Sequence, residues 1–195
     1  MVDPDFDHDL GRALVALARD AIGSRFGRAA AETLHDPALD RPGATFVTLT
    51  QEAGLRGCVG SLEARRALSV DVSANAIAAA FHDPRFAPLA AHEFGITSVE
   101  VSLLSPQEAM AFADEGDLLR QLRPGVDGIV LQHGQRRATF LPQVWETLPE
   151  PRQFVAALKR KAGLREDFWA PDVKAARYTV IKWKEREFIA AEARP

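Results

Sequence analysis

The chain has very little cysteine: Cys58 is the one cysteine in 195 residues. A single cysteine cannot form an internal disulfide, which excludes the class of small extracellular domains that disulfides stabilise. The first ten residues contain four aspartates instead of the basic region and apolar run of a secretory signal. These two features together predict a cytoplasmic protein.

Long apolar runs and an excess of charge are also missing. No uninterrupted apolar stretch approaches the roughly 20 residues that span a bilayer, so we expect no membrane segment. The 24 basic and 27 acidic residues leave a net charge of -3, so no overall positive field favours binding to nucleic acid. A hydrophobic content of 47% is enough for one domain or two closely packed lobes.

Several motifs that would indicate a metal or a cofactor are absent. The five histidines are scattered, and the chain has neither a Cys-x-x-Cys pair nor a His-Glu-x-x-His helix. It also lacks the glycine-rich patterns Gly-x-Gly-x-x-Gly and Gly-x-x-x-x-Gly-Lys-Ser/Thr, which cradle phosphates. We therefore expect no metal site and no nucleotide cofactor.

The first half of the chain shows helix and strand periodicities in turn. Apolar residues at spacings of three and four predict a helix over 10–22. Segments 44–50 and 55–60, joined by Gln51-Glu52-Ala53-Gly54, are typical of a β-hairpin. An alanine-rich run predicts a buried helix over 69–81, which ends before Pro84. Valines alternate with polar residues over 96–104, as in a strand with one face on a core.

The second half repeats this order of elements. We expect strands over 128–132 and 136–141, a helix over 152–162 and a last strand over 178–183. The repeated order of strand, strand, helix, strand suggests an internal duplication. Hairpins linked by helices predict an α+β fold with mainly antiparallel sheets flanked by helices. We expect two lobes, roughly 1–104 and 105–195.

Cys58 lies in the segment Leu55-Arg56-Gly57-Cys58-Val59-Gly60-Ser61. A nearby arginine favours the reactive thiolate, and Gly57 and Gly60 allow close approach of a ligand. On a regular strand Arg56 and Cys58 point to the same face, because strand side chains alternate. Cys58 is therefore a candidate nucleophile or ligand contact. The alternative is a small buried side chain between glycines that packing requires.

Three further groups could contribute to a site. One of them is His92 and Glu93, which are candidates for a base or, alternatively, solvated surface residues. His82, Asp83 and Arg85 offer a base, a carboxylate and a guanidinium after a helix, which could orient an imidazole or clamp an anion. The alternative is a helix end with local turn hydrogen bonds. Trp145 could wall a ligand cleft or anchor a partner, or it could fill the core.

Short motifs occur in a specific order and spacing along most of the chain. They are Leu55-Arg56-Gly57-Cys58-Val59-Gly60, Asp83-Pro84-Arg85-Phe86, Val99-Glu100-Val101-Ser102, Gly125-Val126-Asp127-Gly128-Ile129, Leu141-Pro142-Gln143-Val144-Trp145, Lys161-Ala162-Gly163-Leu164 and Trp169. In these motifs the chain resembles the AMMECR domain family over most of its length. The resemblance implies a single AMMECR domain over 1–195, made of two α+β lobes with a cleft between them. It also implies a pathway shared with a Memo-like protein and a radical S-adenosylmethionine enzyme, without assigning a reaction.

Two functions remain open from the sequence. In the first, the protein is an accessory or binding component that holds an unknown small molecule or protein ligand near Cys58, with contacts from Gly57, Gly60, Asp83, Arg85 and Trp145. In the second, it is an enzyme in which Cys58 is the nucleophile, Arg56 stabilises the thiolate or an anionic substrate, and His82 transfers protons.

Overall fold

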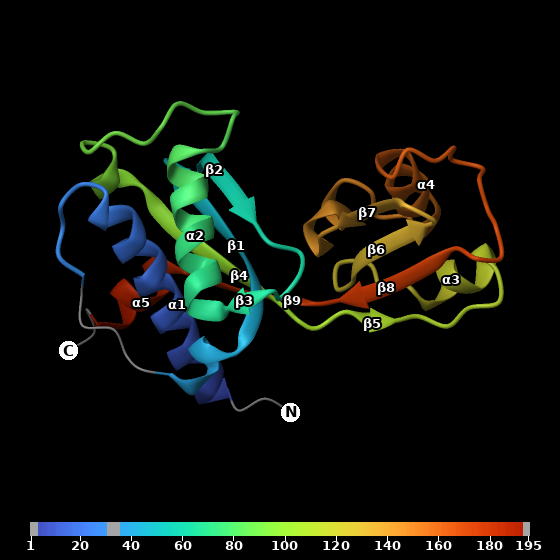
Figure 1. The fold of residues 1–195 in the computed structure, drawn as a ribbon, viewed down its shortest axis with the longest axis horizontal. Coiled ribbons are helices and arrows are strands. Elements are labelled where there is room, and N and C mark those ends of the chain that lie inside the picture. The colour runs from blue at the N-terminus through green and yellow to red at the C-terminus, as the bar shows by residue number, and fades with distance from the viewer. Residues whose placement is uncertain (1–3, 31–35, 193–195) are drawn as a thin grey trace. The chain divides into compact units, whose positions relative to one another are not determined.

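The structure is a computed structural model that describes residues 4–30 and 36–192 (Figure 1). Contacts divide the chain into two units. Unit 1 contains Met1–Leu104 and Ile181–Pro195, and unit 2 contains Ser105–Val180. Each unit has its own hydrophobic core, so each is described by itself. No helix in the described part of the chain is long and apolar enough to cross a membrane.

Unit 1 is a sheet with the order β2-β1-β4-β9, with β3 beside β1 and helices against one face. Its helices and strands are α1 (Pro4–Ser24), β1 (Pro42–Gln51), β2 (Gly54–Gly60), β3 (Arg66–Ala67), α2 (Leu68–Phe81), β4 (Ser98–Leu104), β9 (Val180–Lys184) and α5 (Glu185–Glu192), with short 3-10 turns at Pro37–Asp40 and Phe94–Ile96. β1 pairs antiparallel with β2, β3 and β4. The predicted helices, hairpin and strand of the first half are therefore confirmed.

The hairpin between β1 and β2 turns at Glu52 and Ala53. Both residues have positive φ, 47° and 65°, which is the backbone that a tight two-residue hairpin turn requires. The register then shifts between Leu49 and Thr50: Leu49 pairs with Gly57, while Thr50 pairs with Leu55. Arg56 is thus the extra residue of a β-bulge.

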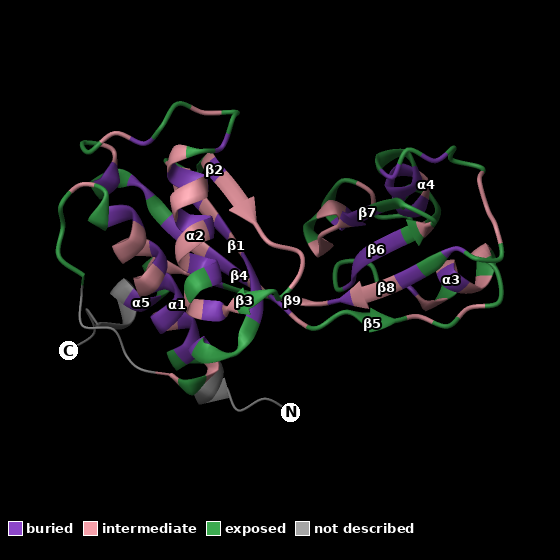
Figure 2. Cartoon of the chain, in the orientation of Figure 1, coloured by how far each residue is buried: buried purple, intermediate pink, exposed green. Residues whose placement is uncertain are grey.

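The sheet of unit 1 has one apolar and one polar face because its side chains alternate. Val47, Leu49, Val99 and Val101 are at most 1% exposed and belong to the core beneath α1 and α2. In Figure 2 the central strands β1 and β4 are more buried than the edge strand β2, which is mostly half-buried. The polar residues between these apolar positions face the other side of the sheet.

Unit 2 is a second antiparallel sheet, with the order β5-β8-β6-β7. Its elements are β5 (Glu108–Ala109), α3 (Glu115–Gln121), β6 (Gly128–His133), β7 (Arg136–Phe140), a 3-10 turn (Pro142–Glu146), α4 (Pro151–Lys161) and β8 (Lys174–Tyr178). The core of unit 2 includes Trp145, Phe154 and Leu158. The predicted hairpin and helix of the second half are confirmed.

The predicted duplication appears in the connectivity of both sheets. In each unit a hairpin is followed by a helix and then by a strand that returns beside the first hairpin strand. The resulting orders are β2-β1-β4 in unit 1 and β7-β6-β8 in unit 2. The α+β class with mainly antiparallel pairing is confirmed.

The chain end differs from the prediction. Instead of one strand over 178–183 there are two strands, β8 and β9, that separate at Thr179. The Thr179 backbone bonds Ser105 instead: Ser105 N–H donates to Thr179 O, and Thr179 N–H donates to Ser105 Oγ. β9 then pairs with β4, and Trp183 enters the core of unit 1. We expected a second lobe of 105–195, whereas 181–195 groups with unit 1.

Candidate functional site

A row of polar side chains crosses the polar face of the unit 1 sheet. Thr48 of β1 lies directly opposite Cys58 of β2 and Glu100 of β4. Its hydroxyl lies 3.4 Å from Cys58 Sγ and donates to it. Beyond Glu100, the Nζ atoms of Lys182 and Lys184 lie 3.9 and 3.8 Å from its carboxylate oxygens. Cross-strand pairing therefore aligns a thiol, a hydroxyl, a carboxylate and two cations.

Side chains from the segment after α2 hold the backbone of Cys58. β2 is an edge strand, and the Cys58 N–H donates to Asp83 Oδ2 at 2.9 Å. Arg85 Nη2 donates to Cys58 O at 3.3 Å and to Asp83 Oδ2 at 2.6 Å. These contacts occupy the backbone groups to which a further strand would bond. Thr48, Cys58, Asp83, Arg85 and Glu100 are called the Cys58 face below.

Asp83 and Arg85 form a close ion pair on this face, with Arg85 Nη2 2.6 Å from Asp83 Oδ2. Arg85 Nε also donates to Asp83 Oδ1, at 2.9 Å, so the pair is bidentate. Hydrogen bonds from Arg85, aided by the backbone N–H groups of Cys58 and Arg85, hold the pKa of Asp83 well below its usual range. The hydrogen bonds with Asp83, with smaller Coulombic contributions from Asp83 and Cys58, raise the pKa of Arg85.

Arg56 is bound to Glu93. Its Nε and Nη2 donate to Glu93 Oε1 and Oε2 at 2.9 and 3.0 Å. Hydrogen bonds from Arg56, followed by that from Ala90 N–H, lower the pKa of Glu93 to about 2. The bulge at Arg56 interrupts the strict alternation on which the expected Arg56–Cys58 contact depends. The arginine that contacts Cys58 is Arg85.

His82 caps the C-terminal end of α2, where its N–H donates to Ala78 O, and it is exposed. In the part of the chain that the structure describes, Cys58 accepts side-chain hydrogen bonds from Thr48 and Arg85 and donates one to Asp83. Among these described residues, His82 makes no hydrogen bond with it. A proton-transfer role for His82 stays a prediction.

Gly57 and Gly60 have packing reasons of their own. A Cβ atom on Gly57 would lie 2.2 Å from Ala79 O, so this glycine lets β2 approach α2. A Cβ atom on Gly60 would lie 2.2 Å from the Phe46 ring. These contacts account for both glycines without a ligand, and their ligand roles stay predictions.

Trp145 lies in unit 2 and is 4% exposed. Its ring stacks on Phe154 with centroids 3.8 Å apart, and its Nε1–H donates to Asp127 O at 2.7 Å. These contacts fit the alternative in which Trp145 fills the core, and its ligand role stays a prediction.

Thr48 and Glu100 are site residues that sequence reasoning missed. Glu100 has a signal, since it is a charged residue on the polar side of an alternating strand. Thr48 has none, because only the register of three strands places it between Cys58 and Glu100. The sequence offers Glu93 as a candidate base, whereas its contact with Arg56 joins residues 37 positions apart and has no local signal.

Comparison with known proteins identifies the family of this chain. A family model described as AMMECR1 matches residues 15–183. The chain belongs to the AMMECR1 family. Three of the segments that suggested this family meet at the Cys58 face: 55–60 in β2, 83–86 after α2, and 99–102 in β4.

Relatives of this AMMECR1-family protein cover nearly its whole length. Proteins from Sulfolobus acidocaldarius and Saccharolobus solfataricus are each 34% identical to it over 190 residues, which is 93% of this chain and 84% of theirs. A crystal structure of a protein from Pyrococcus horikoshii, described as uncharacterised, matches with a TM-score of 0.76 and 32% identity. It covers 90% of this chain and 91% of the other.

Proposed function

We propose that this AMMECR1-family protein is an accessory or binding component of a modification pathway, with its ligand site at the Cys58 face. The observation that supports this most is the pair Asp83–Arg85, which fixes the backbone of Cys58 from outside the sheet. Such a device holds the thiol and the Thr48 hydroxyl in a defined geometry, as a binding site requires.

The partners in this proposal follow from the family resemblance. They are a Memo-like protein and a radical S-adenosylmethionine enzyme, with an unknown small molecule or protein as ligand. A cytoplasmic location belongs to the same proposal, because a free thiol such as Cys58 persists in a reducing compartment.

Binding to a partner tests the proposal. Calorimetric titration with the Memo-like protein from the same genome measures the affinity before and after Cys58 is blocked with N-ethylmaleimide. We expect blocking to weaken binding at least about tenfold, a change of about 1.4 kcal/mol. A Cys58→Ser variant given the same reagent is the control and should keep its own affinity. Binding that is equally strong after blocking would contradict the proposal.

A cysteine-dependent enzyme is the second candidate. The donation from Thr48 to Cys58 Sγ favours it, because a hydrogen bond to the charged form of a group stabilises that form. In this proposal Cys58 is the nucleophile, and Arg85 supplies the positive charge that the sequence assigned to Arg56.

The rate of iodoacetamide alkylation at neutral pH distinguishes the two candidates. An activated nucleophile requires alkylation that is much faster than that of an ordinary thiol and that slows in Thr48→Val. Thr50→Val, at the next position of β1 on the same face, is the matched control. Alkylation at the rate of an ordinary thiol, unchanged in Thr48→Val, would exclude the activated nucleophile.

A further inference from the structure

We propose that the ligand of the Cys58 face carries an oxyanion group, a carboxylate or a phosphate, and that Arg85 binds this group beside the thiol. The inference rests on the proposed function, since it names the chemistry of the ligand that the Cys58 face would take. Three features of the Cys58 face support the proposal. They are the orientation of the ion pair Asp83–Arg85, the guanidinium nitrogen that bonds no described residue, and the charges around Cys58.

The ion pair is oriented with its negative end inward. The Asp83 side chain is 3% exposed, whereas that of Arg85 is 53% exposed. Asp83 Oδ1 accepts from the backbone N–H and Nε of Arg85, and Oδ2 accepts from Cys58 N–H and Arg85 Nη2. Four donors therefore surround the buried carboxylate. A ligand that approaches from solvent meets the cation.

The guanidinium keeps donors for a ligand. Arg85 Nε and Nη2 bond Asp83 and Cys58 O, whereas Nη1 bonds no residue in the described part of the chain. Planar guanidinium groups bind carboxylate and phosphate oxygens through such N–H groups. Because Asp83 fixes the orientation of the guanidinium, little side-chain entropy remains to be lost on binding.

The contact of this cation with the backbone of Cys58 sets where the anion would lie. Arg85 Nη2 is 3.3 Å from Cys58 O, so an anion on the exposed end of the guanidinium lies next to Cys58. The other carboxylates near this face already have cations: Glu93 binds Arg56, and Glu100 lies near both Lys182 and Lys184. Repulsion of an incoming anion is therefore reduced.

Two alkylating reagents that differ in charge test the inference. Iodoacetate carries a carboxylate and iodoacetamide is neutral, and the mass of the intact protein reports Cys58 alone because the chain has one cysteine. We expect the ratio of the two rates, iodoacetate over iodoacetamide, to fall about fivefold in Arg85→Gln at low ionic strength. Arg85→Lys keeps the charge and should retain most of the ratio.

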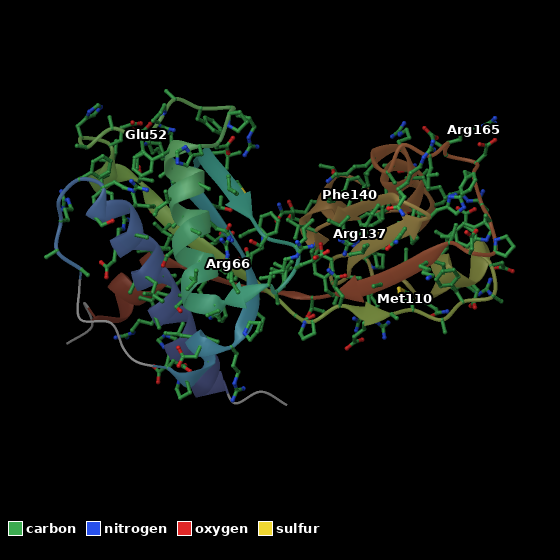
Figure 3. All side chains as sticks on the ribbon, in the orientation of Figure 1. Glu52, Arg66, Met110, Arg137, Phe140 and Arg165 are labelled. Carbon is green, nitrogen blue, oxygen red and sulfur yellow. The ribbon has the colours of Figure 1, made fainter. Side chains whose placement is uncertain are left out.

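Arg165 of unit 2 offers a matched control (Figure 3). Its Nε and Nη2 bond Asp167 two residues away, as those of Arg85 bond Asp83. Arg165→Gln removes the same charge without touching the Cys58 face and should leave the ratio unchanged. In the unsubstituted protein, acetate or inorganic phosphate should slow iodoacetate more than chloride does at equal ionic strength. The stronger competitor identifies the oxyanion group.

The outcomes separate this inference from the proposed function. If both reagents modify the native protein but the ratio is the same in Arg85→Gln, and neither acetate nor phosphate competes, the inference is overturned and the proposed ligand site stands. If neither reagent modifies Cys58 until the protein is denatured, the Cys58 face is closed to small molecules. That result overturns the proposed function and the inference with it.

Discussion

Glu93 joins three segments of the chain through one carboxylate. It accepts hydrogen bonds from Arg56 in β2, from the N–H of Ala90, and from Gln51 Nε2 at the end of β1. Its side chain is 20% exposed, and that of Arg56 is 13% exposed. Charge-assisted hydrogen bonds in such a half-buried setting are stronger than those on an open surface.

The lowered pKa of Glu93 predicts how stability depends on pH. A carboxyl group whose folded pKa of about 2 lies below its ordinary 4.5 stabilises the fold above pH 4.5, and this contribution is lost as the pH falls towards 2. We expect Glu93→Gln to lower the free energy of unfolding by about 2 kcal/mol at pH 7 and to weaken its pH dependence between 4.5 and 2.

Urea unfolding at a series of pH values measures this effect, with Glu146→Gln, an exposed position of unit 2, as control. If the two variants show the same pH dependence as the unsubstituted protein, Glu93 does not carry the effect.

At the scale of elements, a buried polar cluster joins α2 to β1 and to the segment after β2. Its centre is Asp71, which is 1% exposed and accepts hydrogen bonds from donors in all three segments. The donors are Thr45 N, Thr45 Oγ1, Ser61 Oγ, Arg66 Nε and Asn75 Nδ2. Figure 3 labels Arg66, which lies in β3, immediately before α2. The cluster fixes the segment that follows the Cys58 strand.

Removing the centre of this cluster should destabilise unit 1. Asp71→Ala leaves the buried donors without their acceptor, so we expect the free energy of unfolding to fall by about 3–5 kcal/mol. Hydrogen exchange should increase first in residues 61–67. Ser73→Ala, in the same helix, removes a local bond to Ser69 O and should cost less than about 1 kcal/mol. Equal losses in the two variants would contradict this role for Asp71.

At the scale of the whole molecule, unit 1 is assembled from both ends of the chain. Trp183 of β9 is 6% exposed in its core, and its ring packs so closely on Gly11 of α1 that a Cβ atom there would lie 2.3 Å away. Unit 2, in contrast, is continuous in sequence. The last strand therefore completes the core that supports the Cys58 face.

Trp183→Ala should destabilise unit 1 by about 3–5 kcal/mol, because it opens a large cavity in that core. We expect hydrogen exchange measured by mass spectrometry to increase in 10–104 with little change in 105–180. Trp169→Ala is the counterpart in unit 2, where Trp169 packs near Phe112, and should give the reverse pattern. Equal loss of protection in both units after either substitution would show that the units unfold together.

Local patterns in the sequence specify the α+β class, most helices and strands, and the motifs that carry Cys58 and Arg85. Those features depend on local periodicity and on short motifs, which are properties of neighbouring residues. The valines of β4 and the turn at Glu52 and Ala53 are examples, since each pattern is complete within a few positions.

The residues that contact Cys58 depend instead on how distant segments pack. Arg56 is two positions from Cys58 in the sequence, yet it lies in a β-bulge and its guanidinium binds Glu93. Arg85, 27 positions from Cys58, donates to the Cys58 carbonyl. The register of β1 with β2 and β4 places Thr48 beside Cys58 and Glu100 beside Thr48. β8 and β9 separate at Thr179, whose backbone bonds Ser105. Such contacts depend on packing between distant segments, where one bulge or one shift of register changes which side chains meet.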